Sequence, residues 1–259
     1  MASALVTGAT AGIGESFVNL LAAKGYDLIL VARDLPRLDA KAAQLRERFK
    51  IDVEVLSADL SNADELRKVE IRLMDTASPI EVLINNAGFG IRDGFLRSDV
   101  DQENQLLEVL VRAPMRLMHA VLPGMKERNS GTIINVSSVS GWIAGGTYSA
   151  AKSYLTVLSE SLHTELTHTN IHITALCPGF THTEFHQRAK MNMSGLPGFL
   201  WLAADRVAGD AWTASQSGKA VSIPGWQYGI LAGIARFGPR PLVRKLGMTV
   251  RVRQRGKVR

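Results

Sequence analysis

The sequence lacks the cysteine pairs, the long apolar runs and the signal peptide that are typical of secreted or membrane-spanning proteins. Its one cysteine, Cys177, excludes an internal disulfide. No run of about 18 apolar residues is present, so a spanning helix is not expected. The N-terminus, MASALVTGATAGIG, has no basic segment and carries glycines where a signal peptide is apolar. With 46% hydrophobic and 21% charged residues, we expect a globular cytoplasmic protein.

Acidic residues are missing from the C-terminal part of the chain. Residues 211–259 hold ten Lys and Arg and no Asp or Glu, whereas residues 1–210 hold 20 Lys and Arg against 24 Asp and Glu. The net charge of +6 therefore belongs to a tail and not to the body. Because no aromatic interleaving or recognition motif accompanies this charge, we expect no nucleic-acid partner.

Apolar runs alternate with amphipathic stretches along the first three quarters of the chain. Strands are predicted at 4–6, 28–32, 53–56, 81–84, 131–136 and 171–176. Helices are predicted at 13–24, 35–49, 63–76, 101–122 and 148–167. This alternation predicts an α/β fold, a doubly wound (Rossmann-type) parallel sheet with helices on both faces. We expect one domain over 1–229 and a basic C-terminal extension over 230–259.

A glycine-rich turn joins the first strand to the first helix, in the segment TGATAGIG at 7–14. Gly8, Gly12 and Gly14 allow the backbone to approach a pyrophosphate, and the helix N-terminus supplies free N–H groups. The spacing is not GxGxxG, and an ordinary glycine-rich turn is the alternative. Its place at the first strand–helix junction favours phosphate binding.

The end of the second strand bears on the choice of nucleotide. Ala32 stands where an acid would bind a ribose 2′-hydroxyl, and Arg33 follows it. A guanidinium there can pair with a 2′-phosphate, so the sequence predicts NADP(H) over NAD(H). The alternative is a solvated Arg33, for which Asp34 competes.

Three side chains suit proton transfer to a carbonyl oxygen. Tyr148 and Lys152 are separated by one helical turn and share a face. A lysine cation beside the phenol would favour the phenolate and lower the tyrosine pKa toward neutral. Ser138 follows a predicted strand and can hold a carbonyl oxygen. It is preferred to Ser137 because it lies further past the strand end, and Ser140 is a weaker substitute.

Five motifs occur in order over about residues 3–185: TGxxxGxG at 7–14, NNAG at 85–88, Ser138, YxxxK at 148–152, and Pro178-Gly179. Together they resemble the short-chain dehydrogenase/reductase family. The resemblance implies an oxidoreductase that transfers hydride between a nicotinamide and a carbonyl or alcohol. Ser138 would orient the substrate, Tyr148 would transfer the proton, and Lys152 would stabilise its anion and bind the nicotinamide ribose.

The resemblance also implies a set of cofactor-binding residues. Asp59 would lie by the adenine, Asn86 to Gly88 would support the cofactor at the fourth strand, and Thr183 would meet the nicotinamide carboxamide. The alternatives are a capping Asp59, a plain turn at 85–88 and Thr183 as a helix cap. The full set is Gly8, Thr10, Gly12, Ile13, Gly14, Arg33, Asp59, Leu60, Asn86, Ala87, Gly88, Tyr148, Lys152, Pro178, Gly179 and Thr183.

One position departs from the family pattern. Leu110 stands where the family carries an asparagine that helps to hold a water for proton relay. Asn104 is about 240° away around a helix and is a poor substitute. The relay is then weakened or rerouted. A cofactor-binding regulator or scaffold with weak or no turnover is therefore the alternative function.

The loops after the strands are apolar, which favours a hydrophobic ketone, alcohol or 3-oxoacyl substrate. The residues concerned are Phe89, Ile91, Trp142, Ile143, Phe185, Met191, Met193, Leu196, Phe199, Leu200 and Trp201. A mobile lid is predicted at 184–202. His163, His182 and His186 are too scattered for a metal site, so no metal is expected.

Two kinds of partner are expected besides the substrate. Family members commonly pair through the helices at 101–122 and 148–167, which implies a homodimer or homotetramer. Residues 228–237 are apolar, and nine Lys and Arg follow from Arg236 to Arg259. Such a segment suits peripheral contact with an anionic membrane surface. The alternative is a subunit-packing or pocket-covering helix with a frayed basic end.

Overall fold

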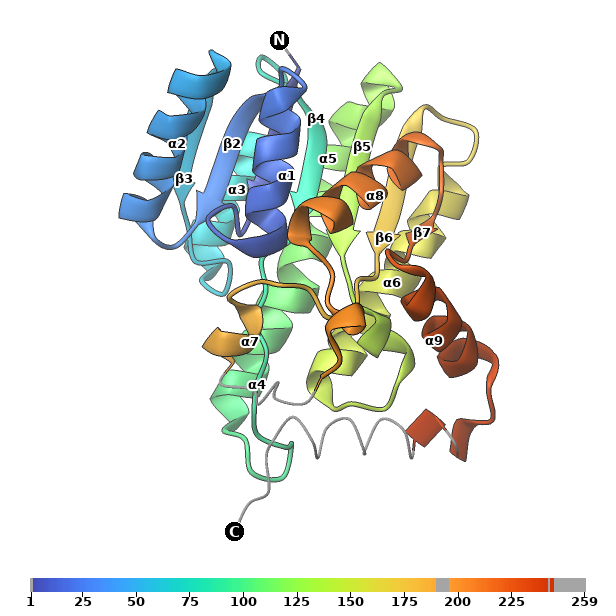
Figure 1. The fold of residues 1–259 in the computed structure, drawn as a ribbon. Helices are drawn as coiled ribbons and strands as arrows, with labels where there is room; N and C mark the ends of the chain where they lie inside the picture. The colour runs from blue at the N-terminus through green and yellow to red at the C-terminus, as the bar shows by residue number, and fades with distance from the viewer. Residues whose placement is uncertain (1, 190–195, 242, 245–259) are drawn as a thin grey trace.

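The computed structural model describes residues 2–189, 196–241, 243 and 244 (Figure 1). Its centre is a seven-stranded parallel sheet in the order β3-β2-β1-β4-β5-β6-β7, which confirms the predicted doubly wound α/β fold. The strands are β1 (Ser3–Thr7), β2 (Asp27–Ala32), β3 (Val53–Ser57), β4 (Ile80–Asn85), β5 (Gly131–Val136), β6 (Ile171–Leu176) and β7 (Val221–Ser222).

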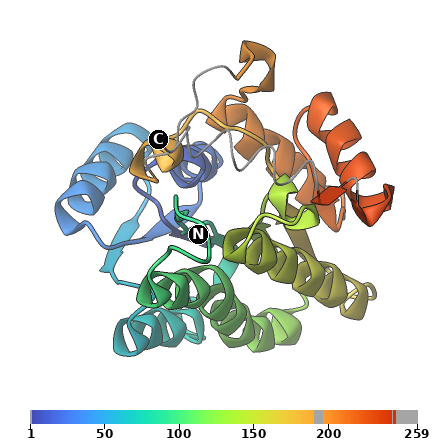
Figure 2. The same cartoon turned by 90° about the horizontal axis from the view of Figure 1, so that it is seen from below.

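Helices cover both faces of this sheet, as the view from below shows (Figure 2). One face carries α1 (Gly12–Ala23), α2 (Leu35–Phe49) and α8 (Ala204–Gln216), and the other carries α3 (Ala63–Leu73), α5 (Ala113–Arg128) and α6 (Thr147–Glu165). The inner strands β1, β2, β4, β5 and β6 are mostly buried on both sides, whereas the edge strand β3 is partly exposed. The inner strands therefore consist of largely apolar runs rather than alternating ones.

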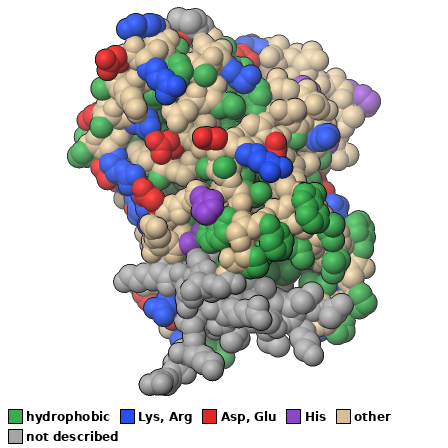
Figure 3. All heavy atoms as spheres, in the orientation of Figure 1, with side chains coloured by type: hydrophobic (Ala, Val, Ile, Leu, Met, Phe, Trp, Pro, Cys, Tyr) green, Lys and Arg blue, Asp and Glu red, His purple; other side chains and the backbone are tan. Residues whose placement is uncertain are grey.

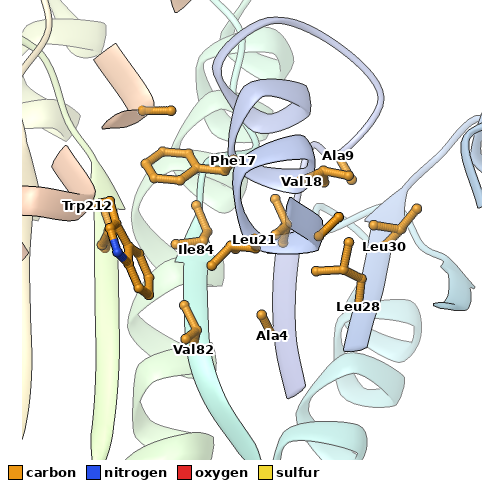
Figure 4. Packing of buried hydrophobic residues seen from close by; sticks show 14 of the residues in the cluster. Ala4, Ala9, Phe17, Val18, Leu21, Leu28, Leu30, Val82, Ile84 and Trp212 are labelled. Atoms are coloured by element: carbon orange, nitrogen blue, oxygen red, sulfur yellow. The ribbon is translucent and has the colours of Figure 1, made fainter. Parts of the chain in front are cut away.

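The packing of α1 shows how one layer is held to the sheet (Figure 4). Phe17 and Leu21 of α1 are fully buried, in one cluster with Ile84 of β4 and Trp212 of α8. Burial of an aromatic or leucine side chain of this kind contributes about 1.5–3 kcal/mol. The helix that follows the glycine turn is thus fixed against the sheet.

The strand order reverses between β1 and β4, because the chain moves to β2 and β3 on one side and returns to β4 on the other. In doubly wound sheets, a crevice forms at such a point outside the carboxyl ends of the strands. Those ends point toward the lower part of Figure 1, where the connecting loops gather.

The predicted helix at 101–122 is corrected by the structure. The chain forms α4 (Val100–Leu107), a wider π-helical turn at Glu108–Arg112, and then α5, which continues to Arg128. Pro114 lacks a backbone N–H and so removes one helical hydrogen bond. Loss of that bond is a recognised cause of local widening and bending in a helix.

The C-terminal part contains elements that the sequence did not reveal. Besides α8 and β7, a helix α9 (Trp226–Phe237) runs across position 230, where the predicted extension begins. Tyr228 anchors α9: its hydroxyl accepts a hydrogen bond from the Phe180 amide at 2.9 Å and donates to the Leu200 carbonyl. No helix in the described part of the chain has the length and apolar content to cross a bilayer.

Gly179 is predicted to be intolerant of a side chain because of Tyr228. A Cβ at position 179 would lie 2.0 Å from atoms of the Tyr228 ring. Gly179→Ala should lower the free energy of unfolding by about 1–3 kcal/mol, measured by urea titration. The cost should be much smaller in a Tyr228→Ala background, where the ring is gone.

Gly209→Ala is the matched control, since a Cβ at position 209 of α8 would meet no atom within 4 Å. Alanine there should be neutral or stabilising. An equal cost of Gly179→Ala in both backgrounds would show that the Tyr228 ring is not the obstacle.

Candidate active site

One cavity of about 1320 Å³ lies at the carboxyl ends of the strands. Its walls contain every predicted catalytic and cofactor-binding residue except Gly14. Its volume exceeds the roughly 300–1,000 Å³ of an ordinary small-molecule site. The fold therefore brings these residues, spread from position 8 to position 183, around a space with room for a dinucleotide and a second ligand.

The glycine turn is closed by contacts that tolerate no side chain. Gly8 and Gly12 have φ of +66° and +57°, and a Cβ on Gly14 would lie 2.2 Å from the Gly8 carbonyl oxygen. Gly14 thus acts through packing and not by lining the cavity. The result is a cradle of backbone at the N-terminus of α1, which suits a pyrophosphate.

Asn86 binds this turn to the end of β4. Its side-chain amide donates to the Thr7 and Gly8 carbonyls at 3.0 and 3.2 Å. The Thr7 hydroxyl in turn accepts from the backbone amides of Asn86 and Ala87 at 2.9 and 3.0 Å. These bonds give Asn86 and Ala87 a structural role as well as a place in the cavity wall.

Two arginines line the cavity beyond the end of β2. Arg33 lies 3.8 Å from the Asp59 carboxylate, and its side chain is 67% exposed. Burial raises the pKa of the Asp59 carboxyl, but hydrogen bonds from Ser61 and the charge of Arg33 outweigh it, so the pKa lies below its usual value. Asp34, the predicted competitor for Arg33, instead caps α2 by accepting from the Arg37 amide at 3.1 Å.

Arg37 was not predicted as a site residue. Its guanidinium donates to the Thr10 carbonyl at 3.1 Å and to the Glu184 carboxylate at 3.2 Å, so it joins the glycine turn to the start of the predicted lid. Hydrogen bonding to Arg37 is the main reason that the pKa of Glu184 lies below its usual value. A contact over 147 positions leaves no signal in the sequence.

The two serines after β5 have different surroundings. Ser137 is buried and donates to the Lys152 carbonyl at 2.7 Å. The Ser138 oxygen accepts from the amide and hydroxyl of Ser140 at 3.1 and 2.9 Å. The Ser138 hydroxyl also lies near the Tyr148 phenol and opposes the rise in its pKa. Since two donors occupy the Ser138 oxygen, its own proton is directed to the phenol or to a substrate oxygen.

Tyr148 and Lys152 lie one turn apart on α6, with the Lys152 Nζ 5.7 Å from the Tyr148 ring centroid. The Nζ donates to the Val136 carbonyl at 2.6 Å. Burial raises the pKa of Tyr148 to about 12, against a smaller opposing effect of the Ser138 hydrogen bond, and lowers the pKa of Lys152 to about 8. The tyrosine pKa therefore does not move toward neutral as expected, because desolvation raises it and the opposing effect of Ser138 is smaller.

Leu110 lies in the π-helical turn and is 1% exposed. It packs with Leu106 and Ala151, and a Cβ on Gly88 would come within 2.8 Å of its methyl group. Leucine thus fills the space that Gly88 leaves open. Its side chain brings no polar atom toward Lys152.

The start of the predicted lid is held by aromatic contacts. In α7 (Phe185–Arg188), the Phe185 ring lies 5.8 Å from the Tyr148 ring. Trp201 stacks on His182 at 4.7 Å and meets His186 edge-on at 5.3 Å. Burial, with a smaller contribution from His182, lowers the pKa of His186.

The apolar wall of the cavity differs in part from the prediction. Phe89, Ile91, Ile143 and Phe185 line it, whereas Trp142, Leu196, Phe199, Leu200 and Trp201 do not. Met191 and Met193 lie outside the described residues. The wall instead gains residues from α9 and beyond it, namely Leu231, Ala232, Ile234, Ala235 and Val243. Within the described ranges, no group of three or more His, Cys, Asp or Glu side chains is placed to hold a metal ion.

A family model described as short chain dehydrogenase matches residues 2–194. The chain belongs to the short-chain dehydrogenase/reductase family, and it is an oxidoreductase that acts on CH–OH or C=O groups with a nicotinamide cofactor.

Among solved structures, the chain is similar to a short-chain dehydrogenase from Sphingobium yanoikuyae in complex with NADPH, at 33% identity and a TM-score of 0.83, covering 100% of this chain and 99% of that one. It is also similar to the bulky-bulky ketone specific alcohol dehydrogenase from Comamonas testosteroni, at 29% identity and a TM-score of 0.79, covering 100% and 97%. The very-long-chain 3-oxoacyl-CoA reductase of Homo sapiens is 30% identical over 188 residues, which are 70% of this chain and 60% of that protein.

The pKa of Lys152 predicts a pH dependence of stability. Between the folded pKa of about 8 and the ordinary 10.5, the folded lysine is neutral while the unfolded one is charged. The unfolded state then binds more protons, so this lysine adds stability as the pH rises through that window and loses it as the pH falls. Relative to Lys152→Met, the wild type should gain on the order of 1–3 kcal/mol between about pH 7 and pH 10, measured by urea unfolding.

Lys126→Met, on the exposed last turn of α5, is the control for loss of a lysine charge. It should show no such change relative to the wild type. A pH-independent difference between the wild type and Lys152→Met would contradict a depressed lysine pKa.

Proposed function

We propose that the protein is an NADP(H)-dependent oxidoreductase that interconverts a hydrophobic ketone, or a 3-oxoacyl substrate, and the corresponding alcohol. The observation that carries this proposal is the placement of Ser138, Tyr148 and Lys152 in the same cavity as the glycine cradle. The cavity offers a dinucleotide the backbone turn at one end and apolar walls at the other. The residues present thus fit a nicotinamide cofactor.

The residues of the chain divide the proton transfer among them. The bound nicotinamide supplies or accepts the hydride at the substrate carbon. Ser138 orients the carbonyl oxygen, and Tyr148 gives its proton to that oxygen in reduction or removes it in oxidation. A phenol with a pKa of about 12 is protonated at neutral pH, which suits reduction. Lys152, when charged, stabilises the phenolate that remains.

Support for NADP(H) over NAD(H) comes from the charges beyond β2. Ala32 offers no carboxylate for a ribose 2′-hydroxyl, and Arg33 follows it with a largely exposed guanidinium. Arg37, which is paired with Glu184, lines the same part of the cavity. The relative from Sphingobium yanoikuyae is in complex with NADPH. A 2′-phosphate is the group that this pair of arginines recognises best.

Support for a hydrophobic substrate comes from the walls around the catalytic tyrosine. Phe185 lies against Tyr148, and Phe89, Ile91 and Val109 face the same space. Such a surface favours bulky apolar groups on the carbonyl carbon. The names of two relatives, a bulky-bulky ketone specific alcohol dehydrogenase and a 3-oxoacyl-CoA reductase, agree with this class.

The alternative, a cofactor-binding regulator with weak or no turnover, rests on Leu110. One feature favours the enzyme over that alternative. A cavity of about 10 Å³ is lined by Lys152, Leu110 and Asn85, and the Asn85 side-chain oxygen is buried without a partner. This volume is near the minimum for one water, which an amide oxygen could hold. We propose that a proton relay from Lys152 runs past Leu110 in this way.

Arg33 is expected to select the phosphorylated cofactor. Arg33→Ala should weaken NADPH binding by about 10- to 100-fold, the worth of a charge-assisted pair, and leave NADH binding nearly unchanged. Fluorescence titration of both nucleotides measures this. The control is Arg206→Ala on α8, whose guanidinium pairs with Asp210 and should not affect either nucleotide. Equal weakening of NADPH and NADH would refute recognition of the 2′-phosphate by Arg33.

Tyr148 is expected to be needed for turnover and not for binding. Tyr148→Phe should lower the rate of NADPH oxidation by about 10²- to 10⁴-fold, because the proton donor is lost. The assay uses a panel of hydrophobic ketones and 3-oxoacyl thioesters. Tyr154→Phe is the matched control, since Tyr154 lies on the same helix with its side chain partly exposed to solvent. Tight NADPH binding without turnover on any member of the panel would favour the regulator.

A further inference from the structure

Helix α9 has two faces of opposite environment. At about 100° per residue, Trp226, Ile230 and Phe237 fall within about 40° of one another around the helix axis. Their side chains are 74%, 56% and 83% exposed. The three residues, called the α9 stripe below, form an apolar surface that no other described element covers. Figure 3 shows hydrophobic side chains gathered over α9 at the lower right of the molecule.

The opposite face of α9 belongs to the active-site cavity. Tyr228, Ala232 and Ala235 are at least nine-tenths buried, and all three line that cavity. Tyr228 is also bound to the segment around Phe180 and Leu200. The helix is therefore rigidly docked on one side, and its outer stripe is held in a fixed orientation. Contact with the cavity accounts for the apolar residues on the inner face of α9, but it does not account for the exposed apolar residues of the α9 stripe.

Exposed cationic side chains follow the α9 stripe. Residues 211–259 hold ten Lys and Arg and no acid. Arg240 and Arg244 are exposed directly after α9, and Arg236 pairs with Glu160 of α6 at 3.2 Å. An apolar stripe with aromatic residues at both ends, beside the exposed cations Arg240 and Arg244, matches the boundary between the acyl chains and headgroups of an anionic bilayer.

The same charge argues against a second copy of the chain as the occupant. A two-fold contact places the same patch of each copy against the other. Here it would bring the exposed Arg240 and Arg244 of each copy toward those of the other. Like charges facing each other across an interface oppose association. Anionic lipid has the opposite charge and accepts the apolar stripe as well.

We propose that α9 is a peripheral membrane anchor that inserts the α9 stripe among anionic lipid headgroups, with Arg240 and Arg244 lying against the phosphates. Because the inner face of α9 forms part of the cavity wall, docking brings the cavity beside the bilayer. An apolar substrate would then enter from the membrane rather than from water. This last step rests on the proposed function, whereas lipid binding does not.

The test is co-sedimentation of the full chain with vesicles of phosphatidylglycerol and phosphatidylcholine in equal parts, against pure phosphatidylcholine. Binding is expected only to the anionic vesicles and should weaken as salt is added. Trp226→Ser with Phe237→Ser should weaken it by about tenfold or more, because apolar insertion is lost. Arg240→Gln with Arg244→Gln should weaken it by about 10- to 30-fold, at about 1 kcal/mol per charge.

Ile71→Ser with Met74→Ser is the matched control, because both residues are exposed apolar side chains at the end of α3. It should bind vesicles as the wild type does. Circular dichroism should show the same melting temperature for the wild type and the Trp226/Phe237 variant. Oxidation of NADPH with a water-soluble ketone, without vesicles, should also be unchanged in that variant. If this activity is absent from the wild type too, the proposed function fails and the vesicle result still stands.

Three outcomes would overturn the anchor. The first is no binding of the wild type to anionic vesicles. The second is equal binding of the wild type and the Trp226/Phe237 variant, which would leave only charge attraction. The third, seen by light scattering, is an oligomer that dissociates in that variant while vesicle binding is retained, which would make the α9 stripe a contact between two copies.

Discussion

The whole site depends on a close contact between two backbones at the point where the sheet changes direction. The turn after β1 and the end of β4 are held together by the Asn86 amide on the Thr7 and Gly8 carbonyls. Gly14 permits this approach because a Cβ there would overlap the Gly8 carbonyl oxygen. The contact sets the start of α1, and α1 is in turn locked by Phe17 and Leu21. The hydrogen bonds of Asn86 at the crevice and the apolar core beneath α1 therefore hold the glycine turn and the start of α1 in the same position.

Burial decides the proton chemistry at the other end of the cavity. Lys152 is buried and Tyr148 is partly buried in the cavity wall, and desolvation shifts the pKa of each in the direction that favours its neutral form. A charge introduced between them, from a substrate oxygen or a ligand, would be screened by little solvent and would change both protonation states strongly. The Ser138 hydroxyl, held by two donors from Ser140, is already oriented for such a charge. The site is organised before a substrate arrives.

The sequence predicted the longer, regular helices and strands well. Predicted ranges coincide with α2, β5 and β6, because buried parallel strands and amphipathic helices carry strong periodic signals. Short or interrupted elements were not predicted. Strand β7 has only two residues, which is too short for a periodic signal. The π-helical turn lies beside a proline, and the effect of a proline depends on its helix context. The motif residues converge as the family resemblance implied. Arg37 and Tyr228 were missed because their roles come from partners far along the chain, Glu184 and Gly179. The shifted pKa of Tyr148 was missed because burial cannot be read from spacing.

The position of Tyr228 has a consequence for how the protein is made. All five sequence motifs lie before residue 180, and a chain synthesised from its N-terminus exposes them first. The Tyr228 ring packs directly against Gly179, so this side of the turn is uncovered until residue 228 has been synthesised and α9 has folded. During synthesis, the sheet and the glycine cradle can therefore form while the cavity still lacks one wall. The pocket is therefore complete only after Tyr228 has been synthesised and has left the ribosome.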